Sequence, residues 1–171
     1  ENDGLEIGGT LTTPTDSDSQ SCVVLVHGSG TADRNYEMGA QQVFKDIAWG
    51  LAERGIASYR YDKRSYLTEL DPSKVGVNWP VVDDAIAATE AIAELPSIDE
   101  ERIFLAGHSR GGMSAPLIAE QWGNYRGVIV LEGYAQPYPE YMAEIMSAQR
   151  ESGETTDRER EVLSKYLSKI E

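Results

Sequence analysis

The sequence is poor in cysteine, histidine and basic residues, and each shortage excludes a class of protein. Its 171 residues hold one cysteine, Cys22, so no disulfide can form within the chain, and its place at the head of an apolar strand predicts a buried thiol. Two isolated histidines without a cysteine cluster cannot make a transition-metal site, so we expect neither metal nor cofactor. Only 15 Lys and Arg stand against 29 Asp and Glu, a net charge of −14 that disfavours nucleic acid and anionic membranes as partners.

Long apolar runs are also missing. No run approaches the roughly 18 apolar residues that span a bilayer, so the sequence predicts a soluble chain. Its length predicts one domain with a proper core. The first residue is Glu1 and not Met, so we expect a trimmed or processed start from which any signal peptide has been removed.

Short apolar runs alternate with amphipathic segments along most of the chain. Strands are predicted at residues 21–26, 56–61, 103–105 and 127–131, and the apolar runs at 23–26, 103–105 and 127–131 indicate buried strands. Helices are predicted at 44–54, at 79–95 and after the glycines at 111–112. This alternation favours right-handed crossovers and a parallel sheet with helices packed on it, which is an α/β fold.

Two further segments have predicted structural roles. Gly8-Gly9 lies between short alternating segments and predicts the turn of an antiparallel hairpin at the sheet edge. Asp62, Lys63 and Arg64 follow the strand at 56–61, where α/β sheets present their ligand-facing loops. We expect these three residues to form an ion-paired loop at the wall of a cleft.

The stretch 102–119 holds the strongest functional pattern. A buried strand leads into GHSRGG, and apolar residues at helical spacing follow, so Ser109 lies on a strand-to-helix turn. Gly107, Ser109 and Gly111 fit G-x-S-x-G, in which the small residues let strand and helix cross closely. Such a turn presents the Ser109 hydroxyl at a helix N-terminus as a candidate nucleophile.

A second glycine-rich turn, HGSG, directly follows the strand at 21–26. Glycines free backbone N–H groups to point into a cleft, toward an oxygen on which negative charge develops. We predict that the N–H groups of Ser29 and Arg110 form this oxyanion pair. The strand-to-helix turn around Ser109 is called the elbow below. The residues predicted to support the HGSG loop and the elbow are His27, Gly28, Gly30, Gly107, His108 and Gly111.

These segments together resemble the α/β-hydrolase family, and more narrowly its bacterial esterase and acyl-hydrolase members. As in those proteins, HGSG is followed by Asp33-Arg34, by F-K-D-x-A-x-G-L-A at 44–52 and by R-Y-D-K-R at 60–64. The resemblance runs from about Leu5 to Gly133. It implies a mostly parallel sheet with helices on both faces, and a serine hydrolase that acts on a small-molecule acyl ester through an acyl-enzyme at Ser109.

The composition changes after Gly133, where Tyr and Met become frequent. Two helices with apolar faces are predicted, at 139–150 and at 156–170. In the resembling family a helical cap inserted here covers the active site, so the resemblance implies a core at 1–133 and a cap or lid segment at 134–171. Ordinary core helices that touch no ligand are the alternative.

The catalytic triad of this family is not complete in the sequence. Its order along the chain is Ser, acid, His, yet no histidine follows Ser109. We expect His27 to pack and hydrogen-bond locally, and His108 to point away from the serine. The resemblance therefore implies an N-terminal half that ends inside the cap and is inactive by itself. Glu132, at the end of 127–131, is a candidate acid because some members carry it there.

Several other functions share parts of this pattern. Thioesterases and serine peptidases of the same fold use the same nucleophile and oxyanion hole, but a carboxylic ester is favoured because the cap offers no basic pair for a carboxylate or phosphate. A non-catalytic binding domain would keep the fold without a base. A Rossmann nucleotide binder is disfavoured because GHSRGG lacks the G-x-G-x-x-G spacing. Without later strands, the edge at 127–131 and the cap helices would favour self-association.

Overall fold

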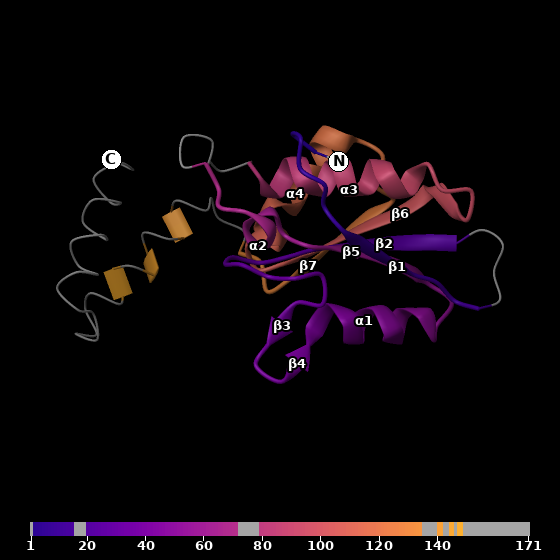
Figure 1. Ribbon diagram of the computed structural model, residues 1–171, viewed down its shortest axis with the longest axis horizontal. Coiled ribbons are helices and arrows are strands. Elements are labelled where there is room, and N and C mark those ends of the chain that lie inside the picture. The colour runs from indigo at the N-terminus through magenta and orange to yellow at the C-terminus, as the bar shows by residue number, and fades with distance from the viewer. Residues whose placement is uncertain are drawn as a thin grey trace. The chain divides into compact units, whose positions relative to one another are not determined.

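The structure is a computed structural model, drawn as a ribbon in Figure 1. The residues that it describes are 2–15, 20–71, 79–134, 140–141, 144–145 and 147–148. The chain divides into two compact units, residues 1–133 and 134–171. In the second unit the described residues from 140 onward are helical, and the rings of Tyr134 and Tyr141 stack with centroids 4.1 Å apart. The helix predicted at 156–170 lies outside the described residues.

A five-stranded sheet forms the centre of the first unit. Its strands are β1 (Gly9–Thr12), β2 (Gln20–Val26), β5 (Ala57–Tyr61), β6 (Ile98–His108) and β7 (Gly127–Leu131). They lie in the order β1-β5-β2-β6-β7, and all pair in parallel except β1, which is antiparallel to β5. This arrangement confirms the predicted α/β fold with a mostly parallel sheet.

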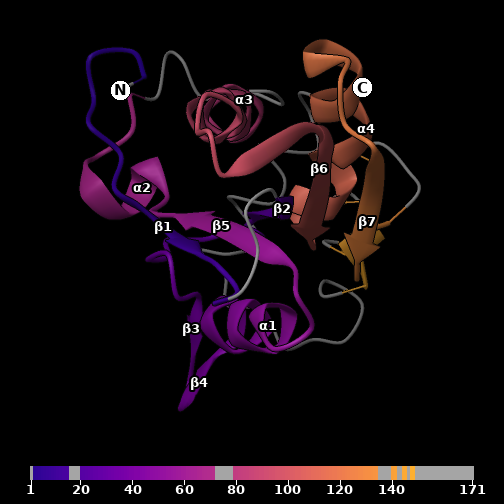
Figure 2. The ribbon, with the colours of Figure 1, turned by 90° about the vertical axis from the view of Figure 1, so that its right-hand side faces the viewer.

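Helices cover both faces of the sheet, as the turned view in Figure 2 shows. Helix α1 (Val43–Ala52) lies on one face, and α3 (Val81–Ala93) and α4 (Arg110–Trp122) lie on the other. The smaller elements are the single-turn helix α2 (Arg64–Leu67) and a separate hairpin of β3 (Glu37–Met38) and β4 (Gln41–Gln42). Each face has its own apolar core, one under α3 and α4 and one under α1.

Strand β2 at the centre of the sheet carries the single cysteine. Cys22 is fully buried, opposite Ala57 of β5 and Ile103 of β6. Burial raises the pKa of its thiol to about 12, because the apolar surroundings disfavour the thiolate.

The hairpin turn predicted at Gly8-Gly9 is wrong. Gly9 begins strand β1, whose partner is β5, and a tight turn lies earlier at Asp3-Gly4. The two glycines instead allow close approach: a Cβ on Gly9 would overlap the side chain of Tyr59, and one on Gly8 would overlap the guanidinium of Arg34. The antiparallel strand at the sheet edge is nonetheless present.

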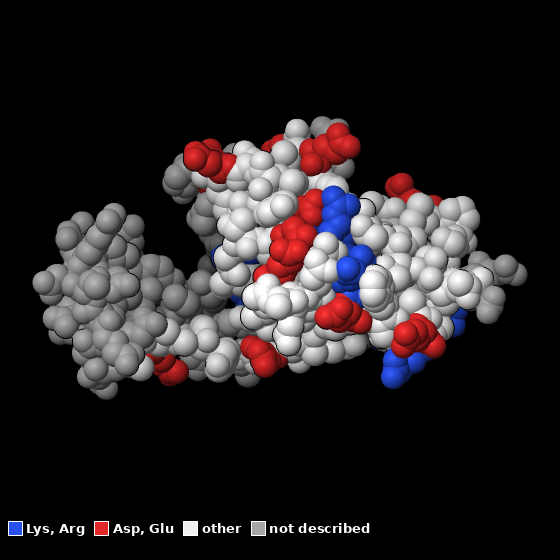
Figure 3. Space-filling model, turned by 60° about the horizontal axis from the view of Figure 1, so that its bottom comes forward, with Lys and Arg blue, Asp and Glu red and all other residues white. Residues whose placement is uncertain are grey.

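In the part of the chain that the structure describes, the helices are too short or too polar to cross a membrane. On the face drawn in Figure 3, acidic side chains lie beside the basic ones.

Candidate active site

Ser109 occupies the turn between β6 and α4. Its backbone has φ 51° and ψ −118°, a conformation that residues with a side chain rarely adopt. Its N–H donates to the Leu131 carbonyl (2.8 Å), and its own carbonyl accepts from the Met113 N–H (2.9 Å). These bonds fix the turn between the end of β7 and the first turn of α4, with Ser109 half-buried.

The glycines around Ser109 mark points where backbone packs directly on backbone. A Cβ on Gly111 would lie 2.5 Å from the carbonyl oxygen of Val26 and 2.6 Å from that of His27. A Cβ on Gly107 would lie 2.6 Å from the nitrogen of Gly112. Any side chain at these positions would push α4 away from β6 and β2. Gly112, which the sequence pattern does not single out, is also closely packed, because a Cβ there would lie 2.8 Å from the carbonyl oxygen of Gly107.

The HGSG loop lies against this elbow. Gly28 is buried, and a Cβ on it would come within 3.0 Å of the Ser109 Cβ, while Ser29 and Gly30 are exposed. Arg110 begins α4, so its N–H belongs to the first turn, whose amide groups point out of the helix. Both predicted oxyanion donors therefore belong to segments that flank Ser109. Their role as donors stays a prediction.

Tyr36 connects the HGSG loop with the elbow, and the sequence did not indicate this. Its hydroxyl lies 2.9 Å from Nδ1 of His108 and also bonds to the Gly28 backbone. Burial raises the pKa of Tyr36, and the bond to Gly28 acts in the opposite direction. A single tyrosine in a loop carries no periodic signal, so only its contacts reveal its place in the site.

His108 uses both ring nitrogens in contacts away from Ser109. Nδ1 faces the Tyr36 hydroxyl, and Nε2 lies 3.3 Å from Oε2 of Glu132, whose side chain is 86% exposed. A nitrogen that already has such a partner is poorly placed to take a proton from Ser109. The candidate acid Glu132 therefore contacts a histidine, but this histidine is directed elsewhere.

His27 is buried in an aromatic cluster. Its ring centroid lies 4.7 Å from that of Phe44, 5.1 Å from Tyr36 and 5.7 Å from Tyr61. Its Nε2–H donates to the Asp33 carbonyl (2.9 Å), whereas the buried Nδ1 has no hydrogen-bond partner among the described residues. Burial lowers the pKa of His27 from 6.5 to about 4, so the ring is neutral at pH 7. These contacts are the local packing that the sequence predicted.

The predicted ion pairs after β5 are present. Asp62 accepts two bonds from the Arg34 guanidinium, at 2.6 and 3.0 Å, and a third from the Arg34 backbone N–H at 2.8 Å. Arg64 pairs at 2.6 Å with Asp84 of α3, and both side chains are buried. These pairs tie the segment after β5 to the loop after β2 and to α3.

Lys63, between the two paired residues, contacts the HGSG loop. Its ammonium group donates to the carbonyl of Gly28 at 2.7 Å and also to the carbonyl of Gly30. Its backbone N–H donates to the carbonyl of Ala32 at 3.1 Å. The sequence did not predict this attachment, because it depends on the path of a loop more than 30 residues earlier in the chain.

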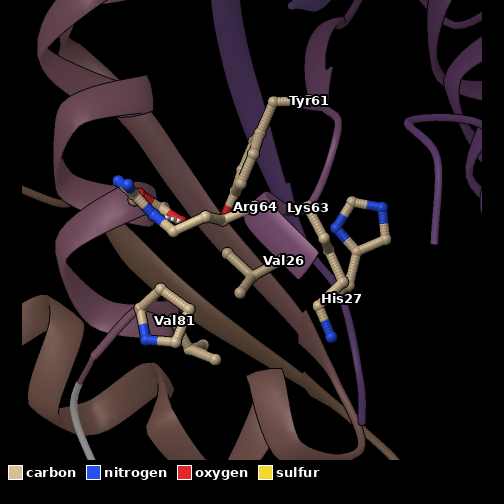
Figure 4. Close-up of a pocket in the computed structure, with 8 residues that line it drawn as sticks. Val26, His27, Tyr61, Lys63, Arg64 and Val81 are labelled. Carbon is tan, nitrogen blue, oxygen red and sulfur yellow. Dashed lines mark hydrogen bonds and ion pairs between the residues drawn. The ribbon is translucent and has the colours of Figure 1, made fainter. Parts of the chain in front are cut away.

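Lys63 and His27 line a small pocket beside the loop. Figure 4 draws these two side chains on one side of the pocket, with Arg64 and Val81 on the other. Burial, together with the positive charge of Arg110, lowers the pKa of Lys63 from 10.5 to about 8. Lys63 is therefore a partly buried cation whose charge changes near neutral pH.

Comparisons with known proteins agree with this arrangement. A model of the alpha/beta hydrolase family matches residues 23–167. Esterase EstD of Thermotoga maritima is 39% identical over 134 residues, which are 78% of this chain and 32% of that protein. The chain thus spans about a third of the length of this curated relative.

Two solved structures have the same fold. Est1E from Butyrivibrio proteoclasticus, solved with ferulic acid bound, has a TM-score of 0.65 at 20% identity over 84% of this chain and 55% of that one. An acetyl xylan esterase from Paenibacillus sp. R4 has a TM-score of 0.58 at 17% identity over 95% of this chain and 58% of that one.

Proposed function

Because the chain belongs to the alpha/beta hydrolase family, we propose that it is the nucleophile-bearing part of a serine esterase that forms an acyl-enzyme at Ser109. The observation that carries this proposal is the backbone of Ser109, which has φ 51° at a strand-to-helix turn and lies against Gly28 of the HGSG loop. Strained serine conformations of this kind persist where surrounding contacts enforce them, and here glycine packing does so. The name of the related esterase EstD supports an ester as the substrate class.

In this mechanism Ser109 Oγ attacks the ester carbonyl carbon while its proton passes to a general base. The N–H groups of Ser29 and Arg110 stabilise the negative oxygen of the tetrahedral intermediate, and the N-terminus of α4 adds a favourable dipole. The C–O bond then breaks, and the leaving alcohol takes the proton from the base. Water then attacks the carbonyl carbon of the acyl-enzyme while the base takes its proton. The bond to Ser109 Oγ breaks, Oγ regains a proton from the base, and the carboxylic acid is released.

The general base in this proposal is a histidine outside residues 1–171. His27 is buried and bonded to Asp33, and His108 is bonded to Tyr36 and contacts Glu132. We therefore propose that the 171-residue chain alone turns esters over very slowly, because it would keep the oxyanion donors and lack the group that moves protons. In this proposal Glu132 remains the candidate for the acid of the catalytic triad.

The test is covalent labelling of protein expressed from the complete gene. A fluorophosphonate probe is expected to label Ser109, and Ser109→Ala should abolish the labelling detected by mass spectrometry. Ser114→Ala, one helical turn along α4, is the matched control and should label like the wild type. Labelling that survives Ser109→Ala, or that maps to Ser29 or Ser114, would overturn the assignment.

A further inference from the structure

The orientation of the Ser29 amide is fixed by a bond on the far side of its own peptide group. The Gly28 carbonyl and the Ser29 N–H belong to one planar unit, and in a trans peptide they point in opposite directions. The Lys63 ammonium lies 2.7 Å from that carbonyl oxygen and also holds the Gly30 carbonyl. Because Lys63 holds the Gly28 carbonyl, the Ser29 N–H points away from Lys63.

We propose that Lys63 is a positioning residue of the esterase site, whose charged side chain holds the Gly28 and Gly30 carbonyls and thereby points the Ser29 N–H toward the reacting carbonyl. The inference rests on the proposed function of Ser109. Lys63 touches neither substrate nor Ser109 in this role, and acts through the backbone of the HGSG loop.

The loop needs such a support because its backbone is intrinsically free. Gly28 and Gly30 have no side chains to pack, Gly30 has φ +82°, and Ser29 is exposed. A hydrogen bond from a charged donor is roughly twice as strong as one between neutral groups. The charged form of Lys63 thus holds the loop more firmly than the neutral amine would.

The surroundings of Lys63 make this support sensitive to pH. The ionisable groups that face it or line the same pocket are Arg110 from α4, His27 from the loop after β2, Tyr61 from β5, Arg64 from α2 and Asp84 from α3. The pKa of His27 is lowered to about 4, that of Tyr61 is raised well above its ordinary value, and Arg64 stays paired with Asp84. Among these groups, Lys63 is therefore the one whose charge changes near pH 8, because its pKa is lowered to about 8.

Kinetics of protein expressed from the complete gene test the proposal with a nitrophenyl acyl ester between pH 6 and 10. Wild-type kcat should fall as pH rises through about 8, because the ammonium group loses its charge. Lys63→Met should lower kcat at least about tenfold with little change in KM, since loss of one oxyanion donor costs about a hundredfold or more. Lys63→Arg should keep most of the activity and move the alkaline fall to higher pH, because guanidinium stays charged.

Lys45→Met is the matched control for removal of a lysine. Lys45 lies on α1, bonded to Gln42 and above the ring of Trp49, so its loss should leave kcat and the pH profile unchanged. Full activity of Lys63→Met, with Ser109→Ala inactive, would overturn the role of Lys63 and leave the proposed function intact. Activity that survives Ser109→Ala would instead overturn the proposed function.

A second measurement covers the case in which Lys63→Met does not fold. In wild-type protein with ¹³C-labelled glycine carbonyls, the resonances of Gly28 and Gly30 should shift with a midpoint near pH 8, and that of Gly50 on α1 should not. Lys63→Arg should abolish the midpoint near pH 8. Glycine resonances that stay constant from pH 7 to 9 would contradict the proposal without reference to activity.

Discussion

Strand β1 at one edge of the sheet is held by two arginine side chains, whereas strand β7 at the other edge carries a run of exposed apolar side chains. The Arg34 guanidinium donates to the Gly9 carbonyl of β1 at 2.9 Å while it pairs with Asp62. Arg60 of β5 donates to the Thr12 hydroxyl at the far end of β1, at 2.7 Å. In β7, by contrast, the consecutive residues Val128, Ile129 and Val130 are 41%, 43% and 49% exposed.

This difference shows that the two edges differ in how well they are protected from pairing with another strand. Exposed edge strands pair readily with other strands, and proteins commonly protect them with charges, short strands or covering segments. Strand β1 has four residues and arginine contacts, while GVIVL of β7 has no charged residue and its three central residues are exposed. We propose that β7 is the edge through which the 171-residue chain associates with another strand.

The largest effect is expected from removing the charge that holds the β1 edge. Asp62→Asn takes away the partner of the Arg34 guanidinium. Breaking a buried pair costs about 3 to 5 kcal/mol, and the Arg34 side chain is 31% exposed, so we expect a loss of about 2 to 3 kcal/mol in the free energy of unfolding. Urea denaturation measures it. Glu132→Gln, the equivalent change after β7, should stay within about 0.5 kcal/mol, and equal losses in the two variants would contradict the comparison.

A smaller effect is expected from adding one methyl group at each edge. Gly9→Ala would place a Cβ in overlap with the Tyr59 ring, 2.7 Å from its Cε2 atom, and should cost about 1 to 2 kcal/mol through overpacking. Gly127→Ala in β7 would meet the Phe104 ring at 3.2 Å and should change the free energy of unfolding by less than about 1 kcal/mol. Thermal melting of the two variants, compared with the wild type, decides whether the first edge is the more tightly packed.

The smallest effect on stability, but a distinct effect on association, is expected from Ile129→Lys. The side chain is already half-exposed, so the free energy of unfolding should change by less than about 1 kcal/mol. Sedimentation at several concentrations should show association of the wild-type 171-residue chain and a shift to monomer in the variant. Met38→Lys, an exposed apolar position in the separate β3–β4 hairpin, should not shift it. A wild-type chain that is monomeric throughout would rule out association through β7.

The sheet could be predicted because its strands are encoded locally. The strands predicted at 21–26, 56–61 and 127–131 correspond to β2, β5 and β7 within one residue at each end. Continuous apolar sequence marks β2 and β7. The prediction that 127–131 is a buried strand is wrong, because Val128, Ile129 and Val130 are exposed. The strand before Ser109 is longer than predicted, because polar residues precede its apolar run. Gly8-Gly9 misled the prediction because glycines also serve close packing, and that use depends on Tyr59 and Arg34 far along the chain.

Of the candidate site, only the backbone turn around Ser109 could be predicted from the sequence. Gly107, Ser109 and Gly111 follow a spacing that the close crossing of strand and helix demands, and the structure has that crossing. Tyr36 and Lys63 could not be predicted, since each acts through a contact made by loop folding and neither belongs to a pattern of spaced residues. The roles of Ser29, Arg110 and Glu132 stay predictions that the labelling and kinetic experiments address.

The burial of Cys22 in β2 has a practical consequence for studies of conformational opening. The chain has no other thiol, and this one is shielded from solvent at the centre of the sheet with its pKa raised to about 12. Thiol reagents attack the thiolate, so modification of Cys22 requires that β2 separate from its neighbours and reach water. The rate of modification in native buffer therefore reports how often the centre of the sheet opens, and no label has to be introduced.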